Sequence, residues 1–148
     1  MKRFLLMVIA LFAINTTVQA QSHKVGDIVV IGNEVGVVFF VTPDGQHGKV
    51  MSTSEITSSW EDACVWCSQL GIGWRLPSRS DLGAIHRKKD RLNSVLSANG
   101  YEAIRNGYYW SADTPSDDGA CYVYMDDGCT YASNKSYYGY SVRAVSAF

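Results

Sequence analysis

The sequence predicts an α+β domain, because the period of the apolar residues changes twice along the chain. Residues 27–52 and 108–145 contain short runs rich in β-branched and aromatic residues, separated by turn residues, which is typical of strands. Between these runs, over residues 60–96, apolar residues recur at intervals of three and four. That spacing is typical of helices that bury one face.

The first twenty residues have the pattern of a secretory signal peptide. Lys2-Arg3 precedes an apolar run over residues 4–14, and Val18-Gln19-Ala20 places small or apolar residues where signal peptidase cleaves. The run is shorter than the roughly 20 residues of a spanning helix, and no lipoprotein-type cysteine follows it. We therefore expect a chain that begins at Gln21 and is exported without stable membrane insertion. A periplasm, the cell surface and the medium are all compatible destinations.

The mature part, residues 21–148, has the length of one globular domain with a single core. Without Lys2 and Arg3, eleven of the thirteen basic residues remain against fourteen acidic ones, so the mature net charge is near minus three. A mildly acidic chain argues against general nucleic-acid binding. Nucleic acid is therefore not an expected partner, and the oligomeric state is left open.

The first third of the mature chain reads as two hairpins. Strands are expected over residues 27–31, 35–41 and 49–52. The second turn contains Thr42-Pro43-Asp44-Gly45, a strong turn signal. His47, beside that turn, has no second histidine or acidic partner in its motif. We interpret it as a turn residue rather than as a catalytic or metal-binding one.

Helical spacing begins at Trp60 and ends at Leu70. The residues that recur on one face include both cysteines of the segment: Trp60, Ala63, Cys64, Cys67 and Leu70. Ser58 or Ser59 is placed to cap this helix, and Gly71 and Gly73 end it.

A distinctive joint, residues 74–82 (WRLPSRSDL), follows the first helix. Pro77 breaks regular structure, and Ser78 is placed to cap a second helix with Asp81 at the capping-box distance. A short helical stretch is expected further on, over residues 92–96.

The one basic cluster of the protein, residues 86–91, lies at the far end of the second helix. We interpret it as a helix C-terminus whose cations complement the helix dipole. A site for a sulfated or acidic glycan is the alternative.

The last third returns to strand patterns. Strands are expected over residues 108–111, 121–125, 129–132 and 140–145. Asp126-Asp127-Gly128 forms a hairpin turn in which the glycine supplies a positive φ. The loop over residues 112–120 is long, polar and acidic, and such loops often carry binding sites.

Four cysteines in an exported chain predict two disulfides. Cys121 lies roughly 13 Å along its strand from the turn that precedes Cys129, too far for a bond that needs Cα atoms about 4.4–6.8 Å apart. We therefore predict that Cys64 and Cys67 pair with Cys121 and Cys129. A Cys64–Cys67 bridge is the main alternative, because Cys-x-x-Cys is also the spacing of thiol oxidoreductases. The wider spacing of the second pair does not suit a zinc site.

Taken in order, these motifs resemble the Lcl C-terminal domain family. That family is similar to the Fibrobacter major paralogous domains and to the sulfatase-modifying-factor enzymes. The resemblance covers roughly positions 26–148 and rests on five groups of residues: the helix at 60–70 with Ala63 and Cys67, Gly73 to Ser78 with Asp81-Leu82, Tyr108 to Ala112, Tyr122 to Tyr124 before Asp127-Gly128, and Val142 to Val145 with Phe148.

The resemblance implies a C-type-lectin-like fold. Two helices would pack on a small, twisted antiparallel sheet with N-terminal β-hairpins, the termini close together and a long loop region on one side. Three positions depart from the family's more usual pattern: Ala112 in place of a second serine, Ala144 in place of a proline and Ser146 in place of an arginine. These departures leave the fold intact.

We expect the recurrent residues to be structural. Large rings suit a core that joins helices to a sheet, and planar guanidinium groups suit loop carbonyls or a carboxylate. The set comprises Trp60, Trp74, Arg75, Pro77, Asp81, Trp110, Arg143 and Phe148.

We expect a non-catalytic binding module rather than an enzyme. The sulfatase-modifying relatives oxidise with a cysteine pair and copper, but the match does not extend to that pair, so neither catalytic residues nor a cofactor are predicted. The expected ligand is a glycan or a protein, and a structural or assembly component of an envelope complex is the alternative. The candidate binding residues lie in the acidic loop and the tyrosine-rich segment: Asp113, Asp117, Asp118, Tyr131, Tyr137, Tyr138 and Tyr140.

No metal site is predicted. The calcium motifs of C-type lectins, Glu-Pro-Asn or Gln-Pro-Asp with Trp-Asn-Asp, do not occur in the sequence. We interpret the acidic pairs at 117–118 and 126–127 as surface turns, although they contain the oxygen ligands that bind a hard cation weakly.

Overall fold

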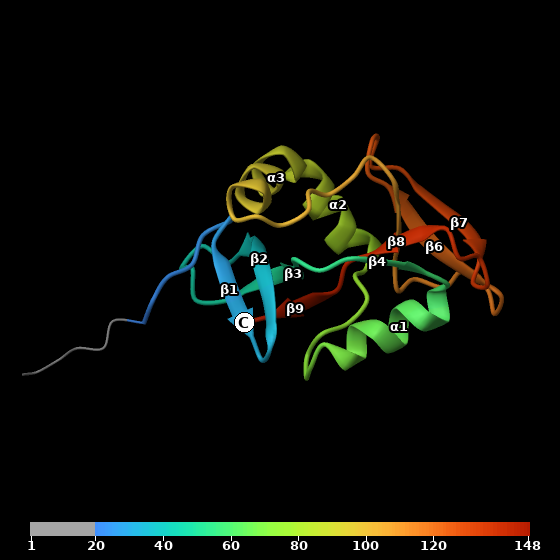
Figure 1. Ribbon diagram of the computed structural model, residues 1–148, viewed down its shortest axis with the longest axis horizontal. Coiled ribbons are helices and arrows are strands. Elements are labelled where there is room, and N and C mark those ends of the chain that lie inside the picture. The colour runs from blue at the N-terminus through green and yellow to red at the C-terminus, as the bar shows by residue number, and fades with distance from the viewer. Residues whose placement is uncertain (1–19) are drawn as a thin grey trace, which may run out of the picture.

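The computed structural model describes residues 20–148 and confirms the α+β class, with three helices and two β-sheets in that part of the chain (Figure 1). The predicted signal peptide, apart from Ala20, lies outside the described residues. Within residues 20–148, no helix has both the length and the apolarity needed to cross a bilayer.

Sheet A contains the two predicted N-terminal hairpins and the last strand of the chain. Its order is β1-β2-β3-β9, all antiparallel. The strands are β1 Ile28–Ile31, β2 Glu34–Val41, β3 Gly48–Ser52 and β9 Val145–Ala147. The first three begin and end within one residue of the positions predicted from the sequence, because the turn residues between them delimit each strand.

Sheet B contains five strands in the order β4-β8-β5-β6-β7. They are β4 Ile56–Ser58, β5 Tyr108–Trp110, β6 Gly119–Tyr124, β7 Thr130–Asn134 and β8 Tyr140–Val142. The pair β5–β8 is parallel, so the expectation of one wholly antiparallel sheet is wrong. The β6–β7 hairpin turns at Gly128, whose φ is 77°, as predicted.

The helices are α1 Trp60–Gln69, α2 Arg79–Arg87 and α3 Lys89–Ala98. The Ser59 hydroxyl caps α1 by accepting the Asp62 amide at 3.2 Å. Gly71 and Gly73, with φ of 135° and 88°, follow the end of α1. The third helix is longer than the predicted stretch over residues 92–96.

The longer α3 corrects the interpretation of the basic cluster. Only His86 and Arg87 lie in the last turn of α2, where cations complement the helix dipole. Lys88 joins the two helices, and Lys89 and Arg91 lie in the first turn of α3. The cluster therefore spans a helix–helix junction rather than one helix C-terminus.

Two hydrophobic cores lie on opposite sides of the sheets. In Figure 1, α2 and α3 lie above the strands and α1 lies below them. The first core joins α2 and α3 to both sheets through residues such as Phe39, Leu82, Leu96 and Val123. The second core joins α1 and the joint to both sheets through residues such as Val50, Ala63, Trp74 and Trp110.

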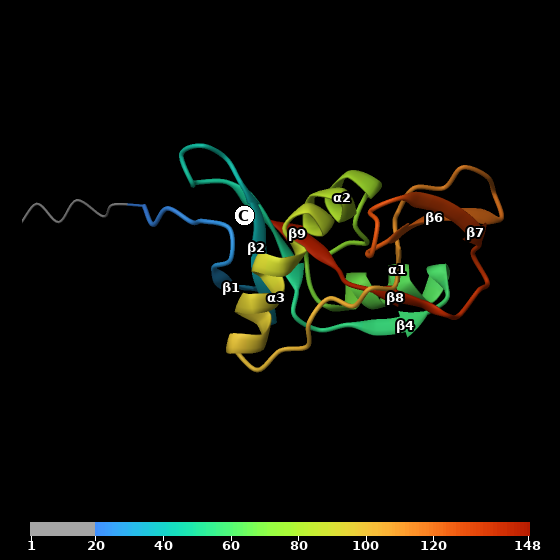
Figure 2. The same cartoon turned by 90° about the horizontal axis from the view of Figure 1, so that it is seen from above.

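The last strand predicted from the sequence, residues 140–145, is in fact two strands in different sheets. Strand β8 ends at Val142 and β9 begins at Val145, so the chain passes from sheet B to sheet A at Arg143-Ala144 (Figure 2). The amide of Ala144 donates to the Ser52 hydroxyl at 3.0 Å instead of to a strand partner. Apolar alternation continues through this crossing, which is why the pattern did not reveal it.

Arg143 stabilises the crossing between the sheets. Its side chain is 1% exposed, and its Nε donates to Glu55 Oε2 at 2.8 Å. Its Nη2 donates to the Glu102 carbonyl oxygen at 2.8 Å. Tyr109 also donates to Glu55 Oε2, at 2.8 Å, and burial followed by the charge of Glu55 raises the pKa of Tyr109 to about 12.

The joint connects α1, α2 and sheet A. Trp74 is 4% exposed, and its Nε1 donates to the Ile31 carbonyl oxygen at 3.1 Å. The backbone of Arg75 pairs with Val145 through bonds of 2.9 and 2.8 Å, which adds a bridge at the outer edge of β9. Pro77 is buried, and its carbonyl oxygen accepts the Ala112 amide at 2.7 Å.

Asp81 completes a capping box at the start of α2 and also binds two cations. Its side chain is 2% exposed and lies 2.7 Å from Lys49 Nζ and 2.9 Å from Arg75 Nη1. It accepts the amide of Ser78 at 3.0 Å. Burial alone would raise the pKa of Asp81, but the hydrogen bonds from Lys49, Ser78 and Arg75 outweigh it and lower that pKa below 3.8.

Asp81→Asn is expected to lower the free energy of unfolding at neutral pH by about 0.5–2 kcal/mol, the usual range for a lost capping interaction. Because the folded-state pKa is lowered, the carboxylate contributes stability above its unfolded pKa and loses it as pH falls through the folded pKa. Urea unfolding of both proteins over a pH series should show the difference shrinking in acid. A difference that stayed constant would exclude the charge as its cause.

The two ends of the described chain meet at sheet A. The ring of His23 lies edge-on to Phe148, with centroids 4.7 Å apart. Gly48 and Phe148 exchange backbone hydrogen bonds of 3.0 and 3.1 Å. A Cβ at Gly48 would overlap the Phe40 carbonyl oxygen and the Phe148 ring, so only glycine fits where the terminal ring packs on β3.

Candidate binding face

Tyrosine rings gather on one face of sheet B. Tyr108 in β5 lies opposite Tyr124 in β6, and Tyr122 in β6 lies opposite Tyr131 in β7. Directly opposed residues of a sheet share a face, so these rings point to the same side. Together with two neighbouring rings they form the aromatic face, defined as Tyr108, Tyr122, Tyr124, Tyr131, Tyr137 and Tyr140.

The rings of the aromatic face contact one another in sequence. Tyr108 stacks on Tyr124 with centroids 4.7 Å apart, and Tyr122 stacks on Tyr131 at 5.6 Å. Tyr140 lies 4.3 Å from Tyr122 by the same measure. Each such pair contributes about 0.5–1.5 kcal/mol beyond buried area. The rings therefore hold one another in place before any ligand arrives.

Helix α1 covers the rest of this side of sheet B. Trp110 is fully buried in the core beneath α1. Trp60, at the start of the helix, donates its Nε1 to the Ser111 carbonyl oxygen at 2.8 Å, and Lys135 Nζ lies 4.8 Å above its ring. The aromatic face is therefore the part of the sheet that α1 leaves uncovered.

Two phenols of the aromatic face, those of Tyr122 and Tyr131, resist ionisation. Partial burial and then the neighbouring Tyr140 hydroxyl raise the pKa of Tyr122 to about 12. The charge of Asp127 raises the pKa of Tyr131. These groups therefore stay neutral at physiological pH and keep both a donor and an acceptor beside an apolar ring.

Three of the seven predicted binding residues belong to this face: Tyr131, Tyr137 and Tyr140. Tyr138 lies in the adjoining loop and is 65% exposed. Three residues of the face were not predicted as binding residues from the sequence: Tyr108, Tyr122 and Tyr124. The signal was present, because aromatic residues recur at intervals of two in Tyr108-Tyr109-Trp110 and Tyr122-Val123-Tyr124, which puts them on one side of neighbouring strands.

The structure does not bring the predicted acidic residues to this face as a group. Asp113 accepts the Arg79 amide at 2.8 Å at the start of α2. Asp117 and Asp118 are exposed, and their carbonyl oxygens, rather than their carboxylates, accept hydrogen bonds from Lys135 at 2.6 and 2.9 Å. The acidic loop is thus held near one end by Arg79 and near the other by Lys135. The carboxylate of Asp113 has a structural contact.

No protein-family model matches the chain, and no curated protein does.

The cysteines lie on different sides of sheet B, and all four carry free thiols in this structure. Cys67, on the buried side of α1, lies in the same hydrophobic core as Ala120 of β6. Cys121 follows Ala120, so its side chain points to the opposite face, which it shares with Val123. The predicted bond between an α1 cysteine and Cys121 is therefore not formed. Cys129 is exposed at the hairpin end.

The Cys64–Cys67 pair does not resemble a reactive dithiol. Burial raises the pKa of Cys67 to about 12, and the neighbouring Cys64 adds to the shift. Burial also raises the pKa of Cys64. Thiol chemistry needs the thiolate, so these shifts oppose reactivity.

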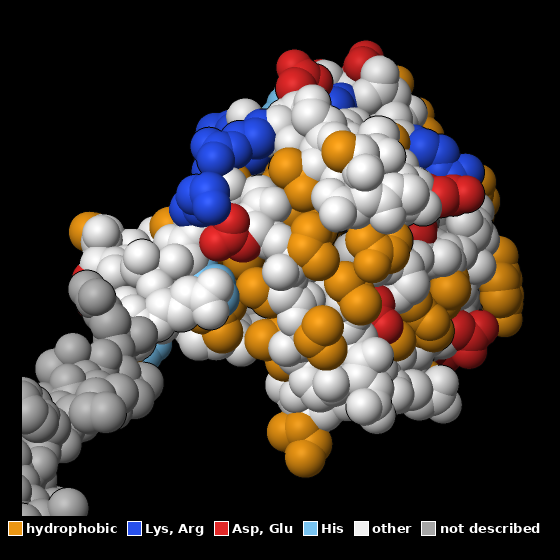
Figure 3. Space-filling model, turned by 60° about the vertical axis from the view of Figure 1, so that its left-hand side comes forward, with side chains coloured by type: hydrophobic (Ala, Val, Ile, Leu, Met, Phe, Trp, Pro, Cys, Tyr) orange, Lys and Arg blue, Asp and Glu red, His pale blue; other side chains and the backbone are white. Residues whose placement is uncertain are grey.

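Basic side chains form a separate patch on the surface (Figure 3). At the α2–α3 junction, a hollow of about 560 Å³ is lined by His86, Arg87, Lys89, Asp90 and Asp126. Two carboxylates oppose the cations there, which weakens any attraction for an acidic glycan. The described residues contain no group of three or more His, Cys, Asp or Glu side chains placed to hold a metal ion.

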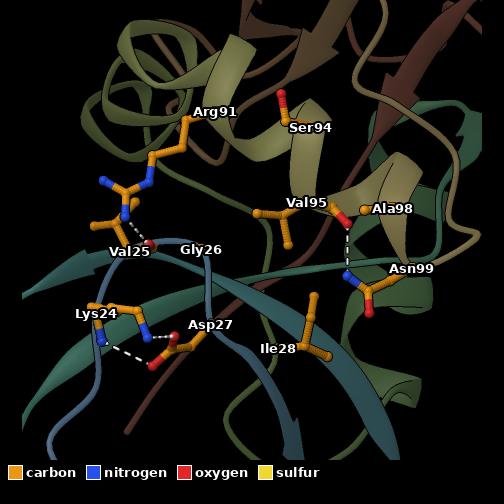
Figure 4. Close-up of a pocket in the computed structure, with 10 residues that line it drawn as sticks. All are labelled: Lys24, Val25, Gly26, Asp27, Ile28, Arg91, Ser94, Val95, Ala98 and Asn99. Carbon is orange, nitrogen blue, oxygen red and sulfur yellow. Dashed lines mark hydrogen bonds and ion pairs between the residues drawn. The ribbon is translucent and has the colours of Figure 1, made fainter.

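A groove of about 500 Å³ separates the segment before β1 from α3 (Figure 4). Its charged groups already have partners, because Lys24 Nζ lies 2.9 Å from Asp27 Oδ1 and Arg91 donates to the Val25 carbonyl oxygen at 2.6 Å. We interpret this groove as the place where α3 packs against the start of sheet A. Of these three surfaces, the aromatic face therefore leaves the most exposed rings and hydroxyl groups available to a ligand.

Proposed function

We propose that the protein is an exported, non-catalytic module that binds a glycan through the aromatic face. The observation that carries the proposal is the exposure of large rings on a pre-ordered sheet: Tyr108, Tyr131 and Tyr137 are 44%, 45% and 51% exposed. Contiguous exposed apolar surface of this kind marks interaction sites.

The chemistry of the rings suits a sugar. A pyranose presents an apolar C–H face and a rim of hydroxyls, and a tyrosine presents an apolar ring with one hydroxyl. The rings extend across sheet B from Tyr140 in β8 through Tyr122 in β6 to Tyr131 in β7. A row of this kind suits an extended oligosaccharide, with one sugar over each exposed ring.

Two expectations from the sequence support this proposal. The resemblance to the Lcl C-terminal domain family implies a C-type-lectin-like fold, and such folds often carry binding surfaces. The signal peptide at residues 1–20 implies export to the periplasm, the cell surface or the medium, where glycans are abundant. A calcium-dependent sugar site is not part of the proposal.

A structural or assembly role in an envelope complex is the second candidate. The edge strand β7, which carries Tyr131 of the aromatic face, favours it, because exposed strand edges pair with other chains. A thiol- or copper-dependent oxidase has the least support, since burial raises the pKa of Cys67 to about 12.

Glycan-array screening of the mature protein should give hits that persist at high salt, because stacking does not depend on ionic attraction. Tyr131→Ala and Tyr108→Ala are each expected to weaken binding about tenfold, the ratio that a loss of about 1.4 kcal/mol gives. Isothermal titration with the best hit measures the change.

Phe40→Ala is the matched control, since Phe40 is an exposed ring of similar accessibility, 44%, on sheet A. It should leave sugar affinity unchanged. Hits that weakened equally in all three variants would exclude the aromatic face as the site. An array without hits would favour the assembly role.

A further inference from the structure

The mature N-terminus that the signal peptide predicts reads Gln21-Ser22-His23. Cleavage after Ala20 frees the α-amine of Gln21 and leaves a histidine as the third residue. The amine, the amide nitrogens of Ser22 and His23, and Nδ1 of the His23 ring then follow one another along the chain. A metal ion that binds these four nitrogens closes a small chelate ring between each nitrogen and the next.

The structure leaves the ring nitrogen of this set without a partner. Within residues 20–148, Nδ1 of His23 is the one buried side-chain nitrogen or oxygen that makes no hydrogen bond. Asp27 Oδ2 lies 3.8 Å from it, too far for a hydrogen bond, and accepts the Lys24 amide at 3.0 Å instead. Native structures rarely leave such an atom unsatisfied. The side chain is 24% exposed, so an ion can reach it from solvent.

The backbone nitrogens of the set have few contacts to lose. Gln21 and Ser22 are exposed, and no described residue accepts the amide of Ser22. The amide of His23 donates to the Gly45 carbonyl oxygen at 2.9 Å. A metal that takes this nitrogen replaces one hydrogen bond, whose net contribution is modest because water competes for both groups. Binding therefore costs that bond and the edge contact of the His23 ring with Phe148.

We propose that the mature N-terminus binds one copper(II) ion through the Gln21 amine, the amides of Ser22 and His23, and Nδ1 of His23. A planar set of nitrogens is typical of copper(II) and nickel(II) sites, and copper(II) binds a given set more tightly. Each of the two amides loses its proton on binding, and a protonated amine loses another. The two amide anions balance the charge of the ion, so no carboxylate ligand is needed.

The copper site is separate from the aromatic face. It uses one side chain, which is compatible with the lack of clustered His, Cys, Asp and Glu ligands among residues 20–148. His23 contacts Gly45 and Phe148 beside sheet A, whereas the aromatic face lies on sheet B. The inference rests on cleavage after Ala20, which the proposed export also implies, and not on glycan binding. Compartments outside the cytoplasm are oxidising, which favours copper(II) over copper(I).

Titration of the mature protein with copper(II) sulfate should show one ion bound per chain, with the visible absorption band of a planar four-nitrogen centre. Ser22→Pro removes an amide proton that the site must release, so the band should be lost. Ser22→Ala keeps the amide and should keep the band. Both variants should melt like wild type without metal, because no described residue accepts the Ser22 amide. His23→Ala should lose the band, and His47→Ala should keep it.

The position of the histidine can be tested without changing a side chain. A mature protein that retains Ala20 has His23 as its fourth residue, so the band should be lost. Copper(II) is paramagnetic, and NMR signals of residues 22–24 should broaden before those around Cys129 in sheet B. A band that survived Ser22→Pro or the retained Ala20, or broadening centred on Cys129, would overturn the site, because other groups would then be the ligands.

Mass spectrometry of the exported protein checks the free amine on which the site depends. A chain that begins at Gln21 with an intact glutamine is the expected result. A different first residue, or a Gln21 cyclised by loss of ammonia, would overturn the copper site, since the terminal nitrogen would be misplaced or no longer an amine. Glycan binding through the aromatic face would stand in either case, so failure of one proposal is distinguishable from failure of the other.

Discussion

Arg143→Met is expected to lower the free energy of unfolding by about 3–5 kcal/mol, the usual cost of removing one partner of a buried ion pair. The Glu55 carboxylate, 4% exposed, would remain in the protein interior without its closest cation, which lies 2.8 Å away. The carbonyl oxygen of Glu102 would lose its donor as well. Methionine fills a similar volume, so the loss reports charge and hydrogen bonds rather than a cavity.

Arg105→Met is the matched control for this prediction. Arg105 also binds Glu55, at 2.9 Å, but its side chain is 63% exposed. Exposed ion pairs contribute about 0–1 kcal/mol, so this variant should unfold close to wild type. Urea denaturation at neutral pH measures both variants.

The double variant Arg143→Met, Glu55→Gln separates the charge from the packing. If an unpaired carboxylate causes the loss, neutralising Glu55 should recover part of it, and the two effects should not add. Equal and additive losses would contradict the proposed origin and indicate that the shape of the side chains matters more than their charge.

Local signals in the sequence predicted much of this fold. Ser59 and Ser78 cap helices where the spacing predicted, and Asp81 completes its capping box. The turn at Gly128 has the positive φ that its composition indicated. Caps and turns depend on interactions within four residues, so they can be recognised without the rest of the fold.

Long-range partners could not be predicted from the sequence. The crossing at Arg143 depends on Glu55, far away in the chain, and apolar alternation continues across it. Strand β4 has three residues, too few for a periodic pattern. The face of β6 to which Cys121 points likewise depends on how the sheet packs, and distance along the hairpin does not reveal it.

The residues of the candidate site also divide into those visible in the local sequence and those that depend on long-range pairing. A tyrosine-rich segment near residue 137 was visible in composition, whereas the neighbouring rings of Tyr108 and Tyr122 join it only through the β5–β8 and β6–β7 pairings. Asp113 looked like a binding residue on an acidic loop. Its contact with the Arg79 amide gives it a structural role instead.

Trp74→Ala is expected to cost about 3–5 kcal/mol, the usual loss for truncating a buried tryptophan. The indole is 4% exposed, and it packs where β2 has no side chain: a Cβ at Gly36 would lie 3.2 Å from its ring. Alanine would leave a cavity between the joint and sheet A, and the Ile31 carbonyl oxygen would lose its donor. Native proteins have about 5–15 kcal/mol in total, so the variant should lose a large fraction of its stability and melt well below wild type.

Ile72→Ala tests whether burial, rather than proximity to the joint, determines the loss at Trp74. Ile72 lies two residues away and is fully exposed, so its truncation should change stability by less than about 0.5 kcal/mol. Thermal melts of the two variants beside wild type would show the contrast. A Trp74→Ala protein that melted within a few degrees of Ile72→Ala would mean that the Trp74 indole does not hold the joint to sheet A, because the remaining contacts of Arg75 and Asp81 would then suffice.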